Sequence, residues 1–120
     1  MKNLIKLICS ILVMCVAQSA LACDYPERIK IPNGTTATKE DMLAGQKGVK
    51  KFVAEMEVYL ACIVEDEKSA RAVMEELSAE EEQQREDMLN KKYNAGVDEM
   101  ERTAAQFNVE VQAYRAKSSS

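Results

Sequence analysis

The sequence predicts an all-α protein: a long antiparallel two-helix hairpin, coiled-coil-like, that carries an extended N-terminal arm. Three observations lead to this prediction. Apolar residues recur every seven positions along two long stretches, as they do on helices with a broad apolar stripe. A capping-box pattern precedes each stretch. The segment before the first stretch contains both prolines of the chain and an Asn-Gly pair.

Residues 1–22 have the pattern of a secretory signal peptide. Lys2 and Lys6 precede an apolar run that ends in "ALA". A charged start, an apolar run of roughly 7–15 residues and an A-x-A ending are the parts of such a leader. The run is shorter than the about 20 residues that a membrane-spanning helix needs. We therefore expect cleavage after Ala22, and a mature chain that begins at Cys23 and is periplasmic or secreted.

The mature chain is acidic, and its acidity is concentrated in one segment. The whole chain has a net charge of −4, and loss of Lys2 and Lys6 makes this −6. Residues 65–87 carry ten acidic and three basic side chains, a net −7, which leaves +1 for the rest. Nucleic-acid phosphates need clusters of Lys and Arg, so we expect no nucleic-acid partner.

The arm is predicted over residues 23–38. Pro26 and Pro32 favour extended backbone, and Asn33-Gly34 is typical of a turn because these residues take positive φ readily. If the arm folds back at this turn, its length allows Cys23 to reach the middle of the first helix.

The first helix is predicted over about Lys39–Leu77. Thr38 followed by Asp41 is a capping-box-like start. We expect the helix to continue through "EDEKS", residues 65–69, because neither Gly nor Pro occurs between Val49 and Tyr93. The apolar rows of this helix comprise Met42, Val49, Phe52, Val53, Met56, Tyr59, Leu60, Ile63, Ala70, Val73, Met74 and Leu77.

The second helix is predicted over about Ala79–Ala116, opened by the capping box of Ser78 and Glu81. The small Gly96 on its stripe can let another segment approach closely. We assign residues 39–117 to the hairpin domain and residues 118–120 to a solvated, disordered tail. The apolar rows of this helix comprise Leu89, Tyr93, Val97, Met100, Ala104, Phe107, Val111 and Tyr114.

Cys23 and Cys62 are the only cysteines that remain after the expected cleavage. An even number of cysteines in an exported protein favours a disulfide. The alternative is a lipoprotein acylated at Cys23, a tethered adaptor at the inner membrane, although Ala20 stands where lipoprotein processing prefers Leu. A third interpretation makes Cys23 a nucleophile with its own α-amine as base, but nothing in the sequence orients such a pair.

The acidic segment supplies the candidate partner-binding residues, which are Glu75, Glu76, Glu80, Glu81 and Glu82. No calcium-loop pattern with its Gly occurs there, so a solvated surface is favoured over a metal site. An acidic cation-binding protein remains an alternative. The five methionines after Cys23 are interpreted as gap-filling core residues rather than ligands of a soft metal.

No catalytic motif is present, and the chain contains no His. We therefore expect a non-enzymatic protein of the cell envelope, without cofactor or metal. The wide apolar stripe favours a protein partner or a homodimer that completes it. Contact with a membrane is expected only if Cys23 is acylated.

The strings "CDYPER", "IPNGTTATKEDML" and "YLAC" resemble small exported helical proteins of Gram-negative bacteria. The resemblance covers the arm and much of the first helix. It implies a compartment, and it transfers no activity, cofactor or catalytic residue.

Overall fold

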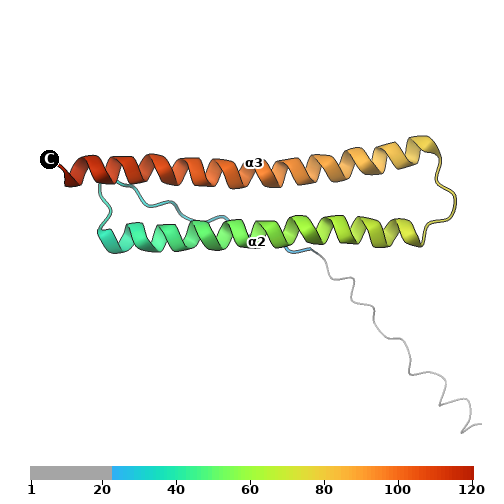
Figure 1. The fold of residues 1–120 in the computed structure, drawn as a ribbon, viewed down its shortest axis with the longest axis horizontal. Coiled ribbons are helices and arrows are strands. Elements are labelled where there is room, and N and C mark those ends of the chain that lie inside the picture. The colour runs from blue at the N-terminus through green and yellow to red at the C-terminus, as the bar shows by residue number, and fades with distance from the viewer. Residues whose placement is uncertain (1–22) are drawn as a thin grey trace, which may run out of the picture.

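The computed structural model describes residues 23–120, so the predicted signal peptide lies outside the described residues. Two long helices, α2 (Lys39–Ala72) and α3 (Ala79–Ser118), run antiparallel and side by side (Figure 1). Residues 23–120 contain no strand. The predicted all-α helical hairpin is confirmed.

Both helices begin where the sequence predicts, because both capping boxes form. The Thr38 hydroxyl accepts a hydrogen bond from the Asp41 N–H at 3.1 Å, and the Asp41 carboxylate accepts one from the Thr38 N–H at 2.8 Å. Ser78 and Glu81 make the same pair of bonds at 3.2 and 2.8 Å. Each box gives partners to N–H groups that the first turn of a helix leaves unpaired.

The predicted end of the first helix is wrong by five residues. α2 ends at Ala72 rather than Leu77, and residues 73–78 form the connection to α3. Packed helix axes lie about 8–10 Å apart, so the chain needs several non-helical residues to cross between them. Val73, predicted on the apolar stripe, is consequently 83% exposed.

The rest of α2 follows the prediction, and α3 is slightly longer than predicted. α2 continues without a break through residues 65–69. α3 continues past Ala116 to Ser118, a residue that the predicted tail included. The hydroxyl of Ser118 donates to the carbonyl of Tyr114 at 3.0 Å, which helps to satisfy the end of the helix.

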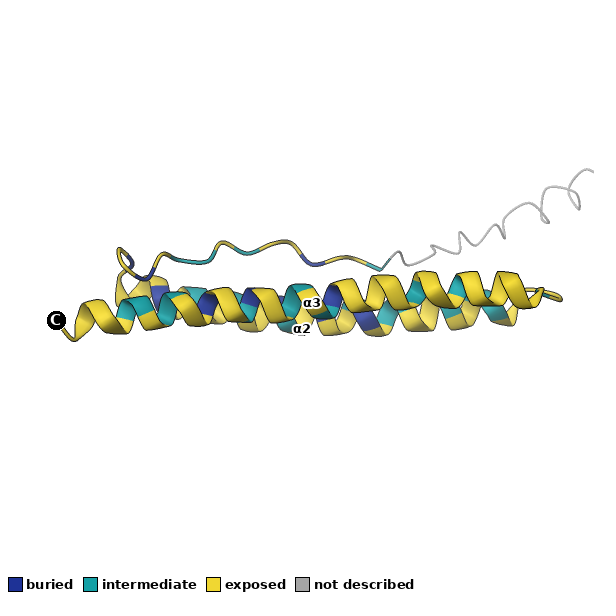
Figure 2. Cartoon of the chain, turned by 90° about the horizontal axis from the view of Figure 1, so that it is seen from above, coloured by how far each residue is buried: buried dark blue, intermediate teal, exposed yellow. Residues whose placement is uncertain are grey.

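The arm lies along the two helices and covers only part of their length (Figures 1 and 2). Ile29 packs against the buried side chains of Phe52, Met56 and Leu60. Ile31 packs against a second buried cluster, which contains Met42 and Phe107 of the two helices together with Ala37. The arm is therefore a third layer that closes the core.

The turn at the end of the arm forms at the predicted position, but its backbone conformation differs from the prediction. The Asn33 carbonyl accepts hydrogen bonds from the N–H groups of Thr36 and Ala37, at 3.1 and 2.8 Å. No residue of the described chain has positive φ, so Gly34 is not needed for backbone freedom. It is needed for space, because a side chain there would overlap the backbone carbonyl of Glu110 in α3.

Candidate functional site

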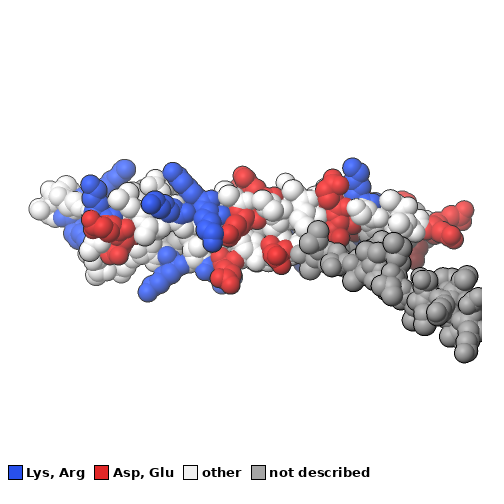
Figure 3. Space-filling model, turned by 90° about the horizontal axis from the view of Figure 1, so that it is seen from below, with Lys and Arg blue, Asp and Glu red and all other residues white. Residues whose placement is uncertain are grey.

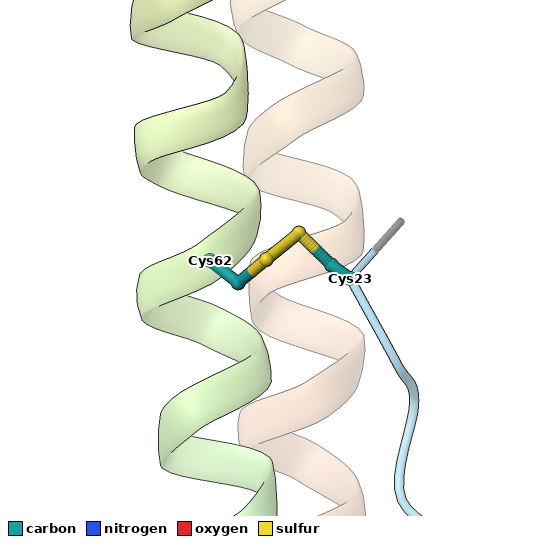
Figure 4. The surroundings of a disulfide bond; sticks show 2 residues. All are labelled: Cys23 and Cys62. Carbon is teal, nitrogen blue, oxygen red and sulfur yellow. A yellow bond between two sulfur atoms is a disulfide. The ribbon is translucent and has the colours of Figure 1, made fainter. Parts of the chain in front are cut away.

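The predicted cysteine pair is present. Cys23 and Cys62 form a disulfide with their Cα atoms 5.7 Å apart, and 39 positions separate them in the sequence (Figure 4). The bond fixes the start of the arm to the side of α2. In this state neither sulfur is a free nucleophile, and the sulfur of Cys23 is not available for acylation.

From this bond to the far end of the arm, aromatic, ionic and hydrogen-bonding contacts hold the arm on the helices. The rings of Tyr25 and Tyr59 meet edge to face with centroids 5.0 Å apart. Arg28 reaches Glu99 of α3 at 3.5 Å, and the Lys117 ammonium donates to the Ala37 carbonyl at 2.7 Å. The arm is thus held by both helices, so we do not expect it to act as a mobile ligand-binding loop.

The five predicted partner-binding carboxylates all lie at the hairpin tip. Glu75 and Glu76 are in the connection, while Glu80, Glu81 and Glu82 are in the first turn of α3, and all five are exposed. Glu81 also has a structural task. Hydrogen bonds from the Ser78 backbone N–H and hydroxyl lower the pKa of its carboxyl. The other four remain available to a partner.

A groove of about 500 Å³ opens between the helices near the tip. We call it the tip groove. Its lining combines an apolar floor with charged edges and consists of Ile63, Asp66, Glu67, Met74, Leu77, Glu81, Gln84, Arg85, Met88, Leu89 and Lys92. Met74 and Met88 are 38% and 59% exposed, so part of the apolar surface stays in contact with water.

Sequence reasoning missed the tip groove because it assigned all the methionines to the core. Met42 and Met56 are buried as predicted, at 7% and 0% exposure. Met74 lies in the connection and Met88 on the part of α3 that the arm does not reach. Met74 lies inside the acidic segment and Met88 directly after it. That position was the available signal, since methionines among charges suit an adaptable binding surface.

One ion-pair cluster joins the two helices beside the tip groove. Both carboxylate oxygens of Glu67 accept hydrogen bonds from the Arg85 guanidinium, each at 2.8 Å, and Arg71 donates to the same carboxylate at 2.9 Å. These bonds, that from Arg85 first, hold the pKa of the Glu67 carboxyl below its usual range. The side chain of Glu67 is only 19% exposed, so this pair is better protected from water than an ordinary surface pair.

The tip groove offers apolar contact and negative charge. Within residues 23–120, no three His, Cys, Asp or Glu side chains converge as the ligands of a metal ion would. Neither helix of this range is long and apolar enough to cross a membrane. The fold and the groove define a small helical hairpin, stapled to its own arm and open at the tip.

No family model, curated protein or solved structure matches this chain. The chemistry of the arm and of the tip groove is therefore the basis on which a function can be argued.

Proposed function

We propose that this is a small exported protein of the cell envelope, periplasmic or secreted, that acts without catalysis as a protein-interaction module. The observation that carries the proposal is the tip groove. The groove presents apolar surface between α2 and α3, in the part of the hairpin that the arm does not reach (Figure 2). Apolar grooves bordered by polar residues are typical of binding surfaces.

Export is supported by two independent features. The first 22 residues carry the charge, apolar run and A-x-A ending of a signal peptide. A disulfide that closes a long loop, as between Cys23 and Cys62, persists in oxidising compartments.

A non-enzymatic role is supported by the residue types at hand. The chain has no His, the most frequent general base. The two cysteines of the described chain are bonded to each other. The carboxylates of the tip are exposed, which gives them no environment that would tune them for proton transfer.

The two alternatives remain weaker. A lipoprotein would need the sulfur of Cys23 for its acyl group, and the disulfide uses that sulfur. A cation-binding protein would need six or more converging oxygen ligands for Ca²⁺, which exposed helical carboxylates do not readily supply.

The proposal is tested by photo-crosslinking in the cells that make the protein. A photo-reactive amino acid replaces either Met88, at the tip groove, or Val109, which is equally exposed (59% and 61%) but lies elsewhere on α3. We expect discrete protein adducts from position 88 that disappear when Met74→Gln is added, and none from position 109. Equal adducts from both positions, or none from position 88, would contradict the proposal.

A mass measurement on the same exported protein tests the compartment and the alternatives. We expect a chain that starts at Cys23, without an acyl group, and two hydrogen masses lighter than its reduced form. Acyl groups on Cys23 would establish the lipoprotein instead.

A further inference from the structure

We propose that the tip groove binds a basic amphipathic helix of a partner protein. The apolar face of that helix would lie between α2 and α3, and its Lys and Arg side chains would face the carboxylates of the acidic hairpin tip. This inference rests on the proposed interaction function and names the chemistry of the partner.

The floor of the groove sets the apolar requirement. Ile63 of α2 and Leu89 of α3 lie at its sides, and Met74 and Met88 leave a large part of their surface exposed. Burial of such side chains stabilises a complex, and the flexible thioether of methionine adapts to the shape of its partner. A helix with apolar residues three and four positions apart presents a matching stripe.

The acidic tip around the groove sets the charge requirement. Asp66, Glu67 and Glu81 line the groove together with Arg85 and Lys92, and further carboxylates lie beside it in the connection and in the first turns of α3. Residues 65–87 carry a net −7, and Figure 3 shows Asp and Glu side chains at the tip end of the molecule, with Lys and Arg mainly toward the other end. Within the described chain, ion pairs engage Glu65 and Glu67 but none of the carboxylates at 75, 76, 80, 82 and 86. Those carboxylates attract a basic partner.

The same charge disfavours a second copy of this chain in the groove. Two tips brought together would place two segments of net −7 in contact, and like charges juxtaposed across an interface cost several kcal/mol. A basic partner gains from the interaction that a second copy would have to overcome.

A comparison of the tip groove with the surface on which the arm lies shows why the partner is a helix rather than an extended segment like the arm. Where the arm packs on the helices, glycines allow the close approach: a side chain at Gly45 would come within 2.7 Å of the Pro32 ring, and one at Gly34 would overlap the backbone of α3. The segment from residue 63 to residue 95 contains no glycine. Its long side chains suit the side chains of a helix better than a backbone at close range.

The length of the groove sets the length of the partner. The helical part of α2 that borders it, residues 63–72, is ten residues long. At 1.5 Å per residue it spans about 15 Å, so the groove contacts roughly three turns of a helix.

Designed peptides are the probe. A fluorescent peptide of Leu, Lys and Ala, about four turns long and amphipathic as a helix, is titrated with the protein in its oxidised state. Two further peptides serve as controls: a scrambled sequence of the same composition, and a version with Glu in place of Lys. We expect the basic helix to bind at least about tenfold more tightly than either control. Raising the salt from about 0.1 M to about 1 M, which shortens the Debye length from about 10 Å to about 3 Å, should weaken its binding.

Variants of the protein test whether the peptide binds in the tip groove. The double variant Met74→Gln and Met88→Gln should weaken binding by about tenfold, because it removes apolar contact from the floor. Val109→Gln, at a site of the same exposure, should leave it unchanged. Both positions of the double variant are at the surface, so thermal melts by circular dichroism should match those of the parent protein.

The outcomes separate this inference from the function on which it rests. Equal binding of the basic and scrambled peptides, or an unchanged affinity in the double variant, would overturn the inference of a basic helix. If the parent protein forms a dimer without any peptide and the double variant is monomeric, the groove is assigned to a second copy of the chain. In either case crosslinks from position 88 but not from position 109 would leave the interaction function standing. No crosslinks from position 88, or equal crosslinks from both positions, would remove both.

Discussion

The hairpin has two halves that share the same helices but not the same protection. In the arm half, residues 23–62 and 96–118, the arm forms a third layer. In the tip half, residues 63–95, no other segment of the described chain covers the two helices (Figure 2). Every buried residue of the described chain lies in the arm half. These residues are Pro26, Gly34, Ala37, Met42, Phe52, Met56, Leu60, Gly96, Thr103 and Phe107.

The difference shows what a pair of helices is able to bury by itself. Two antiparallel helices cover one narrow line of contact, and the apolar stripe here is broader than that line. In the arm half Ile29 and Ile31 cover more of it, because they pack against the two buried clusters. In the tip half the ion pair of Glu67 and Arg85 joins the two helices, with the Glu67 side chain 19% exposed. Stability should therefore reside in the arm half, and binding in the tip half.

The largest effect is expected from breaking the disulfide. Cys62→Ser should lower the free energy of unfolding by about 2–4 kcal/mol, since the unfolded chain regains the freedom of a long loop. It should also expose apolar surface as the arm loosens, so the variant should bind more of a hydrophobic dye. Chemical denaturation with dye fluorescence measures both quantities.

Two controls accompany this prediction. Cys23→Ser and reductant should each match Cys62→Ser, because each removes the same bond. If denaturation without reductant lets an alkylating agent label two free thiols, the bond does not exist in the protein.

The next largest loss of stability is expected from a larger side chain at Gly34, where the arm turn approaches α3 closely. Gly34→Ala would place a methyl group on the Glu110 backbone, and we expect a loss of about 1–3 kcal/mol from the displacement. Gly48→Ala is the matched control, because its new methyl group would meet Ile29 at an ordinary 3.8 Å. In the middle of α2 that substitution should raise stability by about 0.5–1 kcal/mol through helix propensity. Equal melting temperatures for the two variants would show that the turn does not dock as described.

The ion pair between Glu67 and Arg85 in the tip half should contribute less to the free energy of unfolding. Glu67→Gln should cost about 0.5–1 kcal/mol at pH 7, the range of a partly exposed ion pair. Glu65→Gln, whose pairing with Lys68 is 3.8 Å long and exposed, is the control and should cost almost nothing.

The pH dependence of the Glu67→Gln effect follows from the direction of its shift. The pKa of Glu67 is lowered in the folded protein, so its contribution is complete above the unfolded pKa of about 4.3. As the pH falls below that value and through the lower folded pKa, the contribution is lost. The difference in unfolding free energy between parent and variant should thus shrink toward zero in acid. A difference that stays constant from neutral pH into acid would contradict the assignment.

The smallest effect is expected from the exposed rim of the tip half. Glu75→Gln, Glu80→Gln and Glu82→Gln together should leave stability unchanged or raise it slightly at low salt, because like charges repel less. Calorimetric titration of the parent protein with Ca²⁺ should show no specific site. A micromolar isotherm that the triple variant lacks would establish a cation site instead.

The sequence by itself determined the elements and their starting points. Thr38 with Asp41 and Ser78 with Glu81 form hydrogen bonds only with near neighbours, so local pattern is enough to locate both helix starts. The sequence favoured the pairing of Cys23 with Cys62, the two cysteines left after the expected cleavage, but it left acylation of Cys23 open; the structure forms the bond. The seven-residue apolar rhythm predicted two long helices with Phe52, Met56 and Phe107 on their apolar faces, and all three side chains are buried.

The end of α2 could not be predicted in the same way. The connection "VMEELS" contains neither Gly nor Pro, and its apolar residues keep the helical rhythm past Ala72. Its position depends on where α3 returns to pack against α2, which is a contact between distant parts of the chain. The exposure of Val73 and Met74 follows from that contact.

The tertiary structure alone decided which part of the apolar stripe is core and which part is surface. Met56 and Met88 are alike as residues, yet one is fully buried and the other 59% exposed. The arm makes the difference: it runs only from the turn at Asn33 to the bond between Cys23 and Cys62. Beyond Cys62 no other segment of residues 23–120 covers the helices, so the same apolar rhythm that builds the core in one half leaves an open groove in the other.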